Sequence, residues 1–123
     1  MMKIRIKGNS IRYRLTKSEV EGFSKTGINK EITEFDGNTL SYVLKAEEGI
    51  NNLEANFSNN TITLFFPKSF VENWRASNKV GFSHTLVLNS GNQLDLLVEK
   101  DFVCMDETVE DQSDNYPNPK ALN

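Results

Sequence analysis

Five basic side chains near the N-terminus alternate with other residues along two short segments. They are Lys3, Arg5, Lys7, Arg12 and Arg14. Because side chains two residues apart share one face of a β-strand, these cations would gather on a single surface. Arginine offers a two-pronged donor and lysine a point charge, and both suit phosphate oxygens. The sequence therefore predicts an anion-binding face for a phosphate-containing or other anionic small molecule.

Acidic residues later in the chain offer a second interpretation of this face. Asp95, Glu99 and Asp101 would share one face of the last expected strand, and Glu54 adds another carboxylate. These groups could neutralise the cations, or water could solvate them, as on many outward strand faces. Glu99 and Asp101 are also candidates for a countercharge or a hard-metal site. The sequence leaves a neutralised surface and a ligand site both open.

Other reactive side chains favour structural roles. His84 would share a strand face with Phe82 and Leu86, which is typical of a packing histidine. Cys104 precedes an acidic segment, and negative surroundings disfavour a thiolate. One Cys and one His cannot by themselves close a zinc site, and no glycine-rich phosphate loop occurs. We therefore predict no catalytic residue, no dedicated metal site and no cofactor.

The cations are expected on a β-hairpin. Strict alternation predicts strands over residues 3–7 and 10–15, and Gly8-Asn9 permits a tight turn between them. The predicted cross-strand pairs are Lys7 with Ser10, Arg5 with Arg12 and Lys3 with Arg14. Like charges placed opposite each other destabilise a sheet by a few tenths of a kcal/mol or more. Water, carboxylates or a bound anion must therefore offset this repulsion.

The chain resembles itself. Residues 11–23 align with residues 62–74 and share Ile, Lys, Ser, Val and Glu at matched places, and residues 37–40 resemble residues 91–94. Two copies of one supersecondary unit usually pack about a local two-fold axis. The duplication therefore constrains the architecture more tightly than local propensity does.

Each half is expected to form a ββαββ unit. The first half contains predicted strands at 3–7, 10–15, 28–35 and 40–47, and a helix at 17–24 with a capping box of Thr16 and Glu19. The second contains strands at 53–58, 61–66, 80–88 and 94–102, and a helix opened by Pro67. We predict an α+β fold in which eight mainly antiparallel strands form a barrel or strongly curled sheet, since closure removes exposed edges. The alternative is an open two-layer α/β sandwich.

Composition bounds the remaining possibilities. The chain has 123 residues, 37% of them hydrophobic, and a net charge of −3. We expect a single duplicated domain over residues 1–103, with repeats at 1–48 and 53–102, and an acidic irregular tail over 104–123. No segment looks like a signal peptide or a membrane span, which predicts a soluble cytoplasmic protein. Net acidity argues against nonspecific nucleic-acid binding, and the oligomeric state stays open.

Three segments of the sequence resemble a known group. Residues 2–12, 98–104 and 116–119 are similar to a family of small uncharacterised bacterial proteins, which implies no activity. The duplicated strand-helix-strand order also resembles the CYTH domains, the triphosphate tunnel enzymes. Those enzymes carry Glu-x-Glu-x-Lys on their first strand, where this chain has Lys3-Ile4-Arg5-Ile6-Lys7. Only the final lysine of that motif is present.

Two functions follow from these observations. The first is a noncatalytic binding or interaction module whose basic strand face holds an anionic ligand or the chain's own acidic tail. The second is a CYTH-like phosphohydrolase acting on a phosphorylated small molecule. In the second, the five cations would hold phosphate oxygens, and Glu99 or Asp101 would hold a metal.

Overall fold

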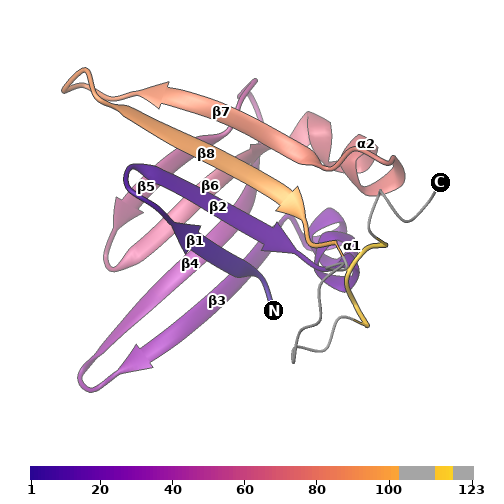
Figure 1. Ribbon diagram of the computed structural model, residues 1–123, viewed down its shortest axis with the longest axis horizontal. Coiled ribbons are helices and arrows are strands. Elements are labelled where there is room, and N and C mark those ends of the chain that lie inside the picture. Colours follow the sequence, from indigo (N-terminus) through magenta and orange to yellow (C-terminus); the bar gives the residue numbers. More distant parts are fainter. Residues whose placement is uncertain (103–112, 118–123) are drawn as a thin grey trace.

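The computed structural model of the protein describes residues 1–102 and 113–117. Cys104 and the acidic residues at 106, 107, 110 and 111 lie outside the described residues. Within the described part, eight strands and two α-helices follow the predicted order of two ββαββ-like units (Figure 1). The first unit comprises β1 (Lys3–Ile6), β2 (Ser10–Leu15), α1 (Lys17–Thr26), β3 (Ile28–Phe35) and β4 (Asn38–Glu47). The second comprises β5 (Glu54–Ser58), β6 (Thr61–Pro67), the 3₁₀ turn η1 (Lys68–Phe70), α2 (Val71–Ala76), β7 (Gly81–Val87) and β8 (Gln93–Lys100).

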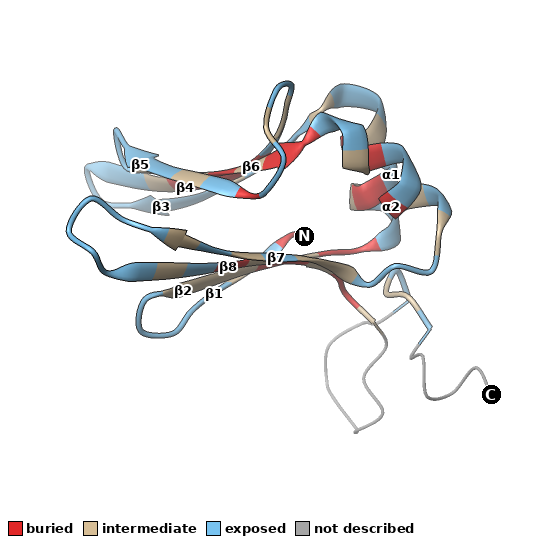
Figure 2. Cartoon of the chain, turned by 90° about the horizontal axis from the view of Figure 1, so that it is seen from above, coloured by how far each residue is buried: buried red, intermediate tan, exposed pale blue. Residues whose placement is uncertain are grey.

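The strands form two separate mixed sheets of four strands each. Sheet 1 has the order β1-β2-β8-β7, and sheet 2 has the order β3-β4-β6-β5. Each sheet takes one hairpin from each half, and the hairpins join through the parallel pairs β2–β8 and β4–β6. The sheets lie face to face, with both helices at one end between them (Figure 2).

The predicted barrel and curled sheet are wrong, and so is the open sandwich with helices covering one sheet. The prediction assumed that duplication would join the outer strands of the two halves. Instead the inner strands β2 and β8 pair, as do β4 and β6, which leaves β1, β7, β3 and β5 as edges. The edge strand β1 has only four residues and carries Lys3 and Arg5. Short, charged edge strands resist pairing with further strands, so the β1 edge needs no closure to protect it.

The two halves are related by an internal two-fold repeat that the pairing registers make explicit. In sheet 1, Ser10 is opposite Asp95, and in sheet 2, Thr61 is opposite Ser41. Residues of the first hairpin and helix therefore correspond to residues 51 positions later in the second half. Residues of β4 correspond to residues of β8 that lie 54 positions later. The N–H of Ala46 donates to the Gly27 carbonyl, and the N–H of Lys100 donates to the Val80 carbonyl in the same way. The duplication read from the sequence is thus present in the backbone.

Local sequence signals begin and end the first helix as expected. The backbone N–H of Thr16 donates to Glu19 Oε1 at 2.9 Å, which completes the predicted capping box. Helix α1 ends at Gly27, whose φ of 78° lies in the left-handed region that glycine adopts without strain. The helix extends two residues beyond the predicted end, because the sequence between Ser24 and Gly27 contains no earlier stop signal.

The core lies between the sheets and beneath the helices. Phe66 of β6 is fully buried and contacts four other aromatic rings, with centroid distances between 5.1 and 6.5 Å. Trp74 is fully buried as well, and its indole N–H donates to the Val80 carbonyl. Such aromatic pairs add about 0.5–1.5 kcal/mol each beyond area burial. Val71 and Trp74 belong to this core, and Phe70 packs against it.

The described part of the tail lies across one side of the molecule, beside α1 and the end of β8. We call residues 113–117 the strap. The N–H of Tyr116 donates to the Asp101 carbonyl at 2.7 Å, and Asp114 accepts a hydrogen bond from the Ser18 hydroxyl at 2.6 Å. The strap therefore connects the start of α1 with the end of β8. Among the described residues, no helix is long and apolar enough to cross a membrane.

Candidate functional site

The outer face of sheet 1 gathers all five predicted cations. Tyr13 and Leu15 are fully buried on the inner face of β2, so the alternate residues Arg12 and Arg14 point outward. The same alternation places three carboxylates on the outer face of β8 and just beyond its end. The charged residues of this face are Lys3, Arg5, Lys7, Arg12, Arg14, Asp95, Glu99 and Asp101. The face therefore carries more positive than negative side chains.

The pairing register arranges these residues in rows across the sheet. Arg5 is opposite Arg12, as predicted, and Arg12 is opposite Leu97 of β8. In the next row, Lys3 is opposite Arg14, and Arg14 is opposite Glu99. The row of Arg5 and Arg12 thus contains no carboxylate, whereas the neighbouring row contains one.

Carboxylates neutralise the end of the face nearest α1. Arg14 Nε lies 2.7 Å from Glu99 Oε1, and Arg12 Nε lies 3.7 Å from the same oxygen. Lys3 Nζ lies 3.2 Å from Asp101 Oδ2, whose residue is only 4% exposed. Glu99 and Asp101 therefore each lie within ion-pair distance of a cation of this face. In these pairs the cation is partly exposed and the carboxylate is largely buried.

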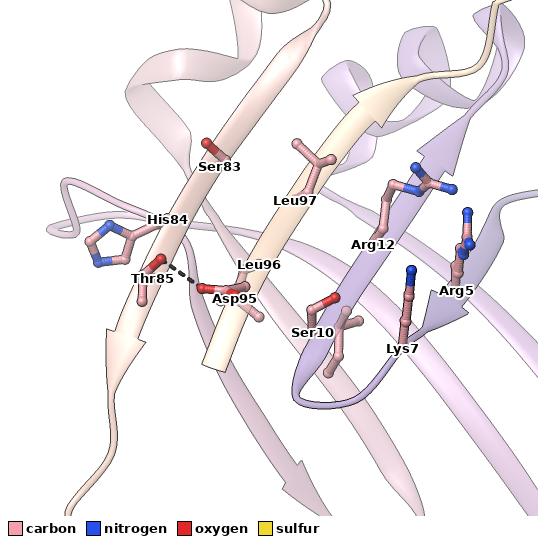
Figure 3. Close-up of a pocket in the computed structure, with 11 residues that line it drawn as sticks. Arg5, Lys7, Ser10, Arg12, Ser83, His84, Thr85, Asp95, Leu96 and Leu97 are labelled. Carbon is pink, nitrogen blue, oxygen red and sulfur yellow. Dashed lines mark hydrogen bonds between the residues drawn. The ribbon is translucent and has the colours of Figure 1, made fainter. Parts of the chain in front are cut away.

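The end of the face nearest the β1–β2 turn stays positive. Among the described residues, no carboxylate lies within ion-pair distance of Arg5 or Lys7. The Lys7 and Ser10 backbones exchange two hydrogen bonds, and this pairing fixes the turn beside Arg5. Figure 3 shows the charged ends of Arg5, Lys7 and Arg12 on one side of the sheet. We call these three residues the basic cluster.

Arg12 is the most constrained cation of the basic cluster. Its side chain is 25% exposed, and its buried Nε has no hydrogen-bond partner in the part of the chain that the structure describes. Burial lowers the pKa of the Arg12 guanidinium, and the charge of Arg14 lowers it further, while Glu99 opposes these effects. A bound anion would replace the hydrogen bonds to water that Arg12 loses on burial, and it would offset the repulsion from the neighbouring arginines.

A shallow depression of about 610 Å³ lies on this face between the basic cluster and β7. Leu97 forms part of its floor, and Ser83 and Thr85 of β7 line its far side (Figure 3). The Thr85 hydroxyl donates to Asp95 Oδ1 at 2.7 Å, so this carboxylate is already engaged. The depression offers positive charge on one side, and hydroxyl groups, apolar surface and the negative charge of Asp95 on the other.

Three further residues that line the depression, Ser83, Thr85 and Leu97, were not predicted from the sequence. Ser83, Thr85 and Leu97 show only ordinary strand alternation, and they reach the basic cluster only because β8 pairs with β2. The matched spacing of the two repeats was the signal that could have suggested this pairing. His84 also lines the depression, but its side chain projects away from the basic cluster (Figure 3). It is half-buried beside Phe82 and Leu86, consistent with a packing role.

The described residues of this face show no grouping typical of metal chemistry. The described residues contain no group of three His, Cys, Asp or Glu side chains placed to hold a metal ion. Glu99 and Asp101, the candidate metal ligands, each contact cations instead. Guanidinium and ammonium donors around an open depression are suited to phosphate or carboxylate oxygens.

The fold and the site together define a duplicated α+β protein of two mixed sheets with a basic outer face. The chain matches the family described as "Family of unknown function (DUF7009)" over residues 2–120, and it belongs to that family. No curated protein and no solved structure matches the chain. The resemblance to an uncharacterised family is thus confirmed, while no similarity to CYTH domains is shown.

Proposed function

We propose that this protein is a noncatalytic binding module that holds a phosphate-containing small molecule at the basic cluster. The observation that carries the proposal is the row in which Arg5 faces Arg12 without a carboxylate, beside Lys7. Phosphate oxygens would accept hydrogen bonds from both guanidinium groups, and Lys7 would add a further positive charge. The open depression leaves the rest of such a ligand over Leu97, within reach of the β7 hydroxyls.

The acidic tail is the alternative occupant predicted from the sequence. The described strap does not serve this role, since Asp114 contacts Ser18 at the start of α1. The acidic residues between the end of β8 and the strap are outside the described part of the chain. A soluble ligand therefore has direct geometric support, whereas occupation by the tail rests on charge alone.

The hydrolase alternative gains no support from a specific observation. It requires Glu99 or Asp101 to hold a metal, yet Glu99 lies 2.7 Å from Arg14 and Asp101 lies 3.2 Å from Lys3. Both carboxylates thus act as countercharges on an open outer face. The CYTH-like activity remains a prediction of the sequence analysis only.

Titration with pyrophosphate tests the proposed function. The full chain labelled with ¹⁵N would be titrated at low ionic strength, and backbone amide shifts would be recorded. We expect saturable shifts at residues around the basic cluster and weaker binding as salt is added, because screening reduces exposed charge interactions. Arg5→Ala should weaken binding by about tenfold, the value of one good charge-assisted contact.

Lys30→Ala is the matched control, since Lys30 is an exposed cation on the outer face of sheet 2. Its affinity for pyrophosphate should equal that of the unmodified protein. Equal losses for the Arg5 and Lys30 variants would show nonspecific attraction to total charge. That result, or the absence of saturable shifts up to about 10 mM pyrophosphate, would overturn the proposal.

A further inference from the structure

The strand β3 is the longest of the four edge strands. It has eight residues, against four in β1, five in β5 and seven in β7. Figure 1 shows β3 at the lower edge of sheet 2. Within residues 1–102 and 113–117, β4 is the only strand that pairs with β3, so its other side is free of strands. A long edge strand with unpaired backbone groups is a template for pairing with a further strand.

The backbone alternation of β3 shows which residues face this free side. The N–H of Ala46 donates to the Gly27 carbonyl just before the strand begins. Because an antiparallel pair is hydrogen-bonded at every second residue, the odd-numbered residues of β3 bond to β4. The N–H and C=O groups of the even-numbered residues therefore point to the free side. These residues are Ile28, Lys30, Ile32 and Glu34.

The unpaired stretch of this edge is centred on Ile32. At one end, the Ile28 N–H donates to the Thr26 hydroxyl at 3.3 Å, and the same hydroxyl lies 3.0 Å from the Ile28 carbonyl oxygen. Thr26 thus covers the backbone groups of Ile28. In the described part of the chain, no hydrogen bond reaches the outward backbone groups of Lys30, Ile32 or Glu34. The strand ends at Phe35, one residue beyond this stretch.

The charges of this stretch are self-complementary. When two copies of β3 lie antiparallel with Ile32 opposite Ile32, Lys30 of each copy is opposite Glu34 of the other. Opposite charges at facing positions stabilise a strand pair, and like charges destabilise it. Both side chains are exposed, and neither forms an ion pair among the described residues.

Other antiparallel registers lose this match. Centring the pairing on Lys30, Glu31 or Glu34 places a like charge opposite that residue. Moving the centre by one residue toward the turn places the apolar Ile32 opposite Glu34. Only the register centred on Ile32 pairs the three residues that have unpaired backbone groups exclusively with one another. The position of these groups and the order of the charges therefore select the same register.

We propose that two copies of this chain associate through β3, which joins sheet 2 of each copy into one continuous sheet about a two-fold axis. Lys30, Ile32 and Glu34 of each copy would each donate and accept one backbone hydrogen bond across the axis. The Ile32 side chains, which are 54% exposed in the single chain, would cover each other. Anion binding at the basic cluster does not depend on this contact, because the cluster lies on sheet 1.

The other two longer edges lack these features. Lys3 and Arg5 give the edge strand β1 charges of one sign, which repel a second copy. The edge strand β7 contains no Lys, Arg, Asp or Glu, so no charge pattern selects a register there.

Hydrogen exchange of the ¹⁵N-labelled full chain, followed by NMR at about 20 µM and about 500 µM, tests the proposal. The amides of Lys30, Ile32 and Glu34 should exchange about tenfold more slowly at the higher concentration. The amide of Glu31, which bonds to β4 in either state, should change much less. Sedimentation over the same concentrations should show an equilibrium between monomer and dimer.

A charge swap tests the register. Lys30→Glu and Glu34→Lys should each weaken dimerisation by about tenfold, because each places like charges opposite one another. The double variant restores opposite charges, and its dimerisation should return to within about threefold of the unmodified protein. Lys45→Glu is the matched control, since Lys45 is an exposed cation on the neighbouring strand β4, and it should leave dimerisation unchanged.

Ile32→Lys provides an independent variant, because it places two lysines opposite each other at the axis. It should abolish the dimer, while an unchanged melting temperature at low concentration shows that the chain stays folded. A monomer at every concentration would overturn the proposal. Protection of the three amides that does not depend on concentration would also overturn it, because residues of the same chain would then cover the edge. A dimer unaffected by these variants, or larger oligomers, would place the contact on another surface and have the same consequence.

Discussion

The outer faces of the two sheets have the same backbone register but differ in charge at matched positions. The positions of Arg5, Lys7 and Arg12 in sheet 1 correspond to uncharged residues of sheet 2. Those counterparts are Asn56, Ser58 and Thr63. Asn56 is opposite Thr63 in the same way that Arg5 is opposite Arg12. The fold can therefore be built with neutral polar side chains at all three places.

The uncharged counterparts in sheet 2 show that the fold does not require the basic cluster. Two arginines placed opposite each other destabilise a strand pair by a few tenths of a kcal/mol. Sheet 2 avoids that repulsion, and sheet 1 accepts it at Arg5 and Arg12. The proposed binding role would account for these cations.

Replacing the cluster by its counterparts gives the largest expected effect. The triple variant Arg5→Asn, Lys7→Ser and Arg12→Thr should lose pyrophosphate affinity by about 100-fold, because three charged donors are removed. Its melting temperature should stay the same or rise slightly, since the repulsion disappears. Calorimetric titration and thermal unfolding measure the two quantities. Unchanged affinity would show that the difference between the two faces has no role in binding.

Replacing Glu99, the main countercharge, tests the end of the face that lies nearest α1. Glu99→Gln leaves Arg12 and Arg14 without their shared carboxylate, so pyrophosphate affinity should rise by about five- to tenfold. The free energy of unfolding should fall by about 1 kcal/mol, because the ion pairs are lost. Chemical denaturation and the same titration measure both effects. A fall in affinity would instead indicate that Glu99 itself contributes to the ligand site.

The contact of the strap with the start of α1 gives the smallest expected effect. Hydrogen bonds from Ser18 and Thr16 lower the pKa of the Asp114 carboxyl. A depressed pKa stabilises the fold above the ordinary value near pH 4, and this contribution is lost as pH falls through the folded value. Asp114→Asn should therefore lower stability by a few tenths of a kcal/mol at pH 7, and the difference should shrink below about pH 4. Thermal unfolding across this pH range measures it. A difference that does not shrink as the pH falls further below the ordinary pKa would contradict a role for the charged carboxylate.

The sequence was sufficient to predict the local structure around the site. Period-two alternation predicted β2 and β3 with the observed bounds, and the Gly8-Asn9 turn predicted that Arg5 faces Arg12. The capping box predicted the start of α1. These features depend on residues close together in the chain, and local patterns report them directly.

Contacts between distant segments could not be predicted in the same way. The alternation of β2 identifies its inner face but not β8 as its parallel neighbour, so Leu97 and Ser83 were missed beside Arg12. Lys100 was missed as a buried residue because lysine rarely loses its water. Its amine is satisfied by the Ser77 carbonyl and the Tyr116 ring, which only the tertiary structure brings to it.

The exchange of hairpins between the halves also dictates when the molecule can fold. Ser10 pairs with Asp95, so sheet 1 cannot assemble until the chain has been synthesised beyond β8. Neither half contains a complete sheet by itself. An ancestor of half this length would have needed two copies, each lending a hairpin to the other, to build what one chain now builds alone.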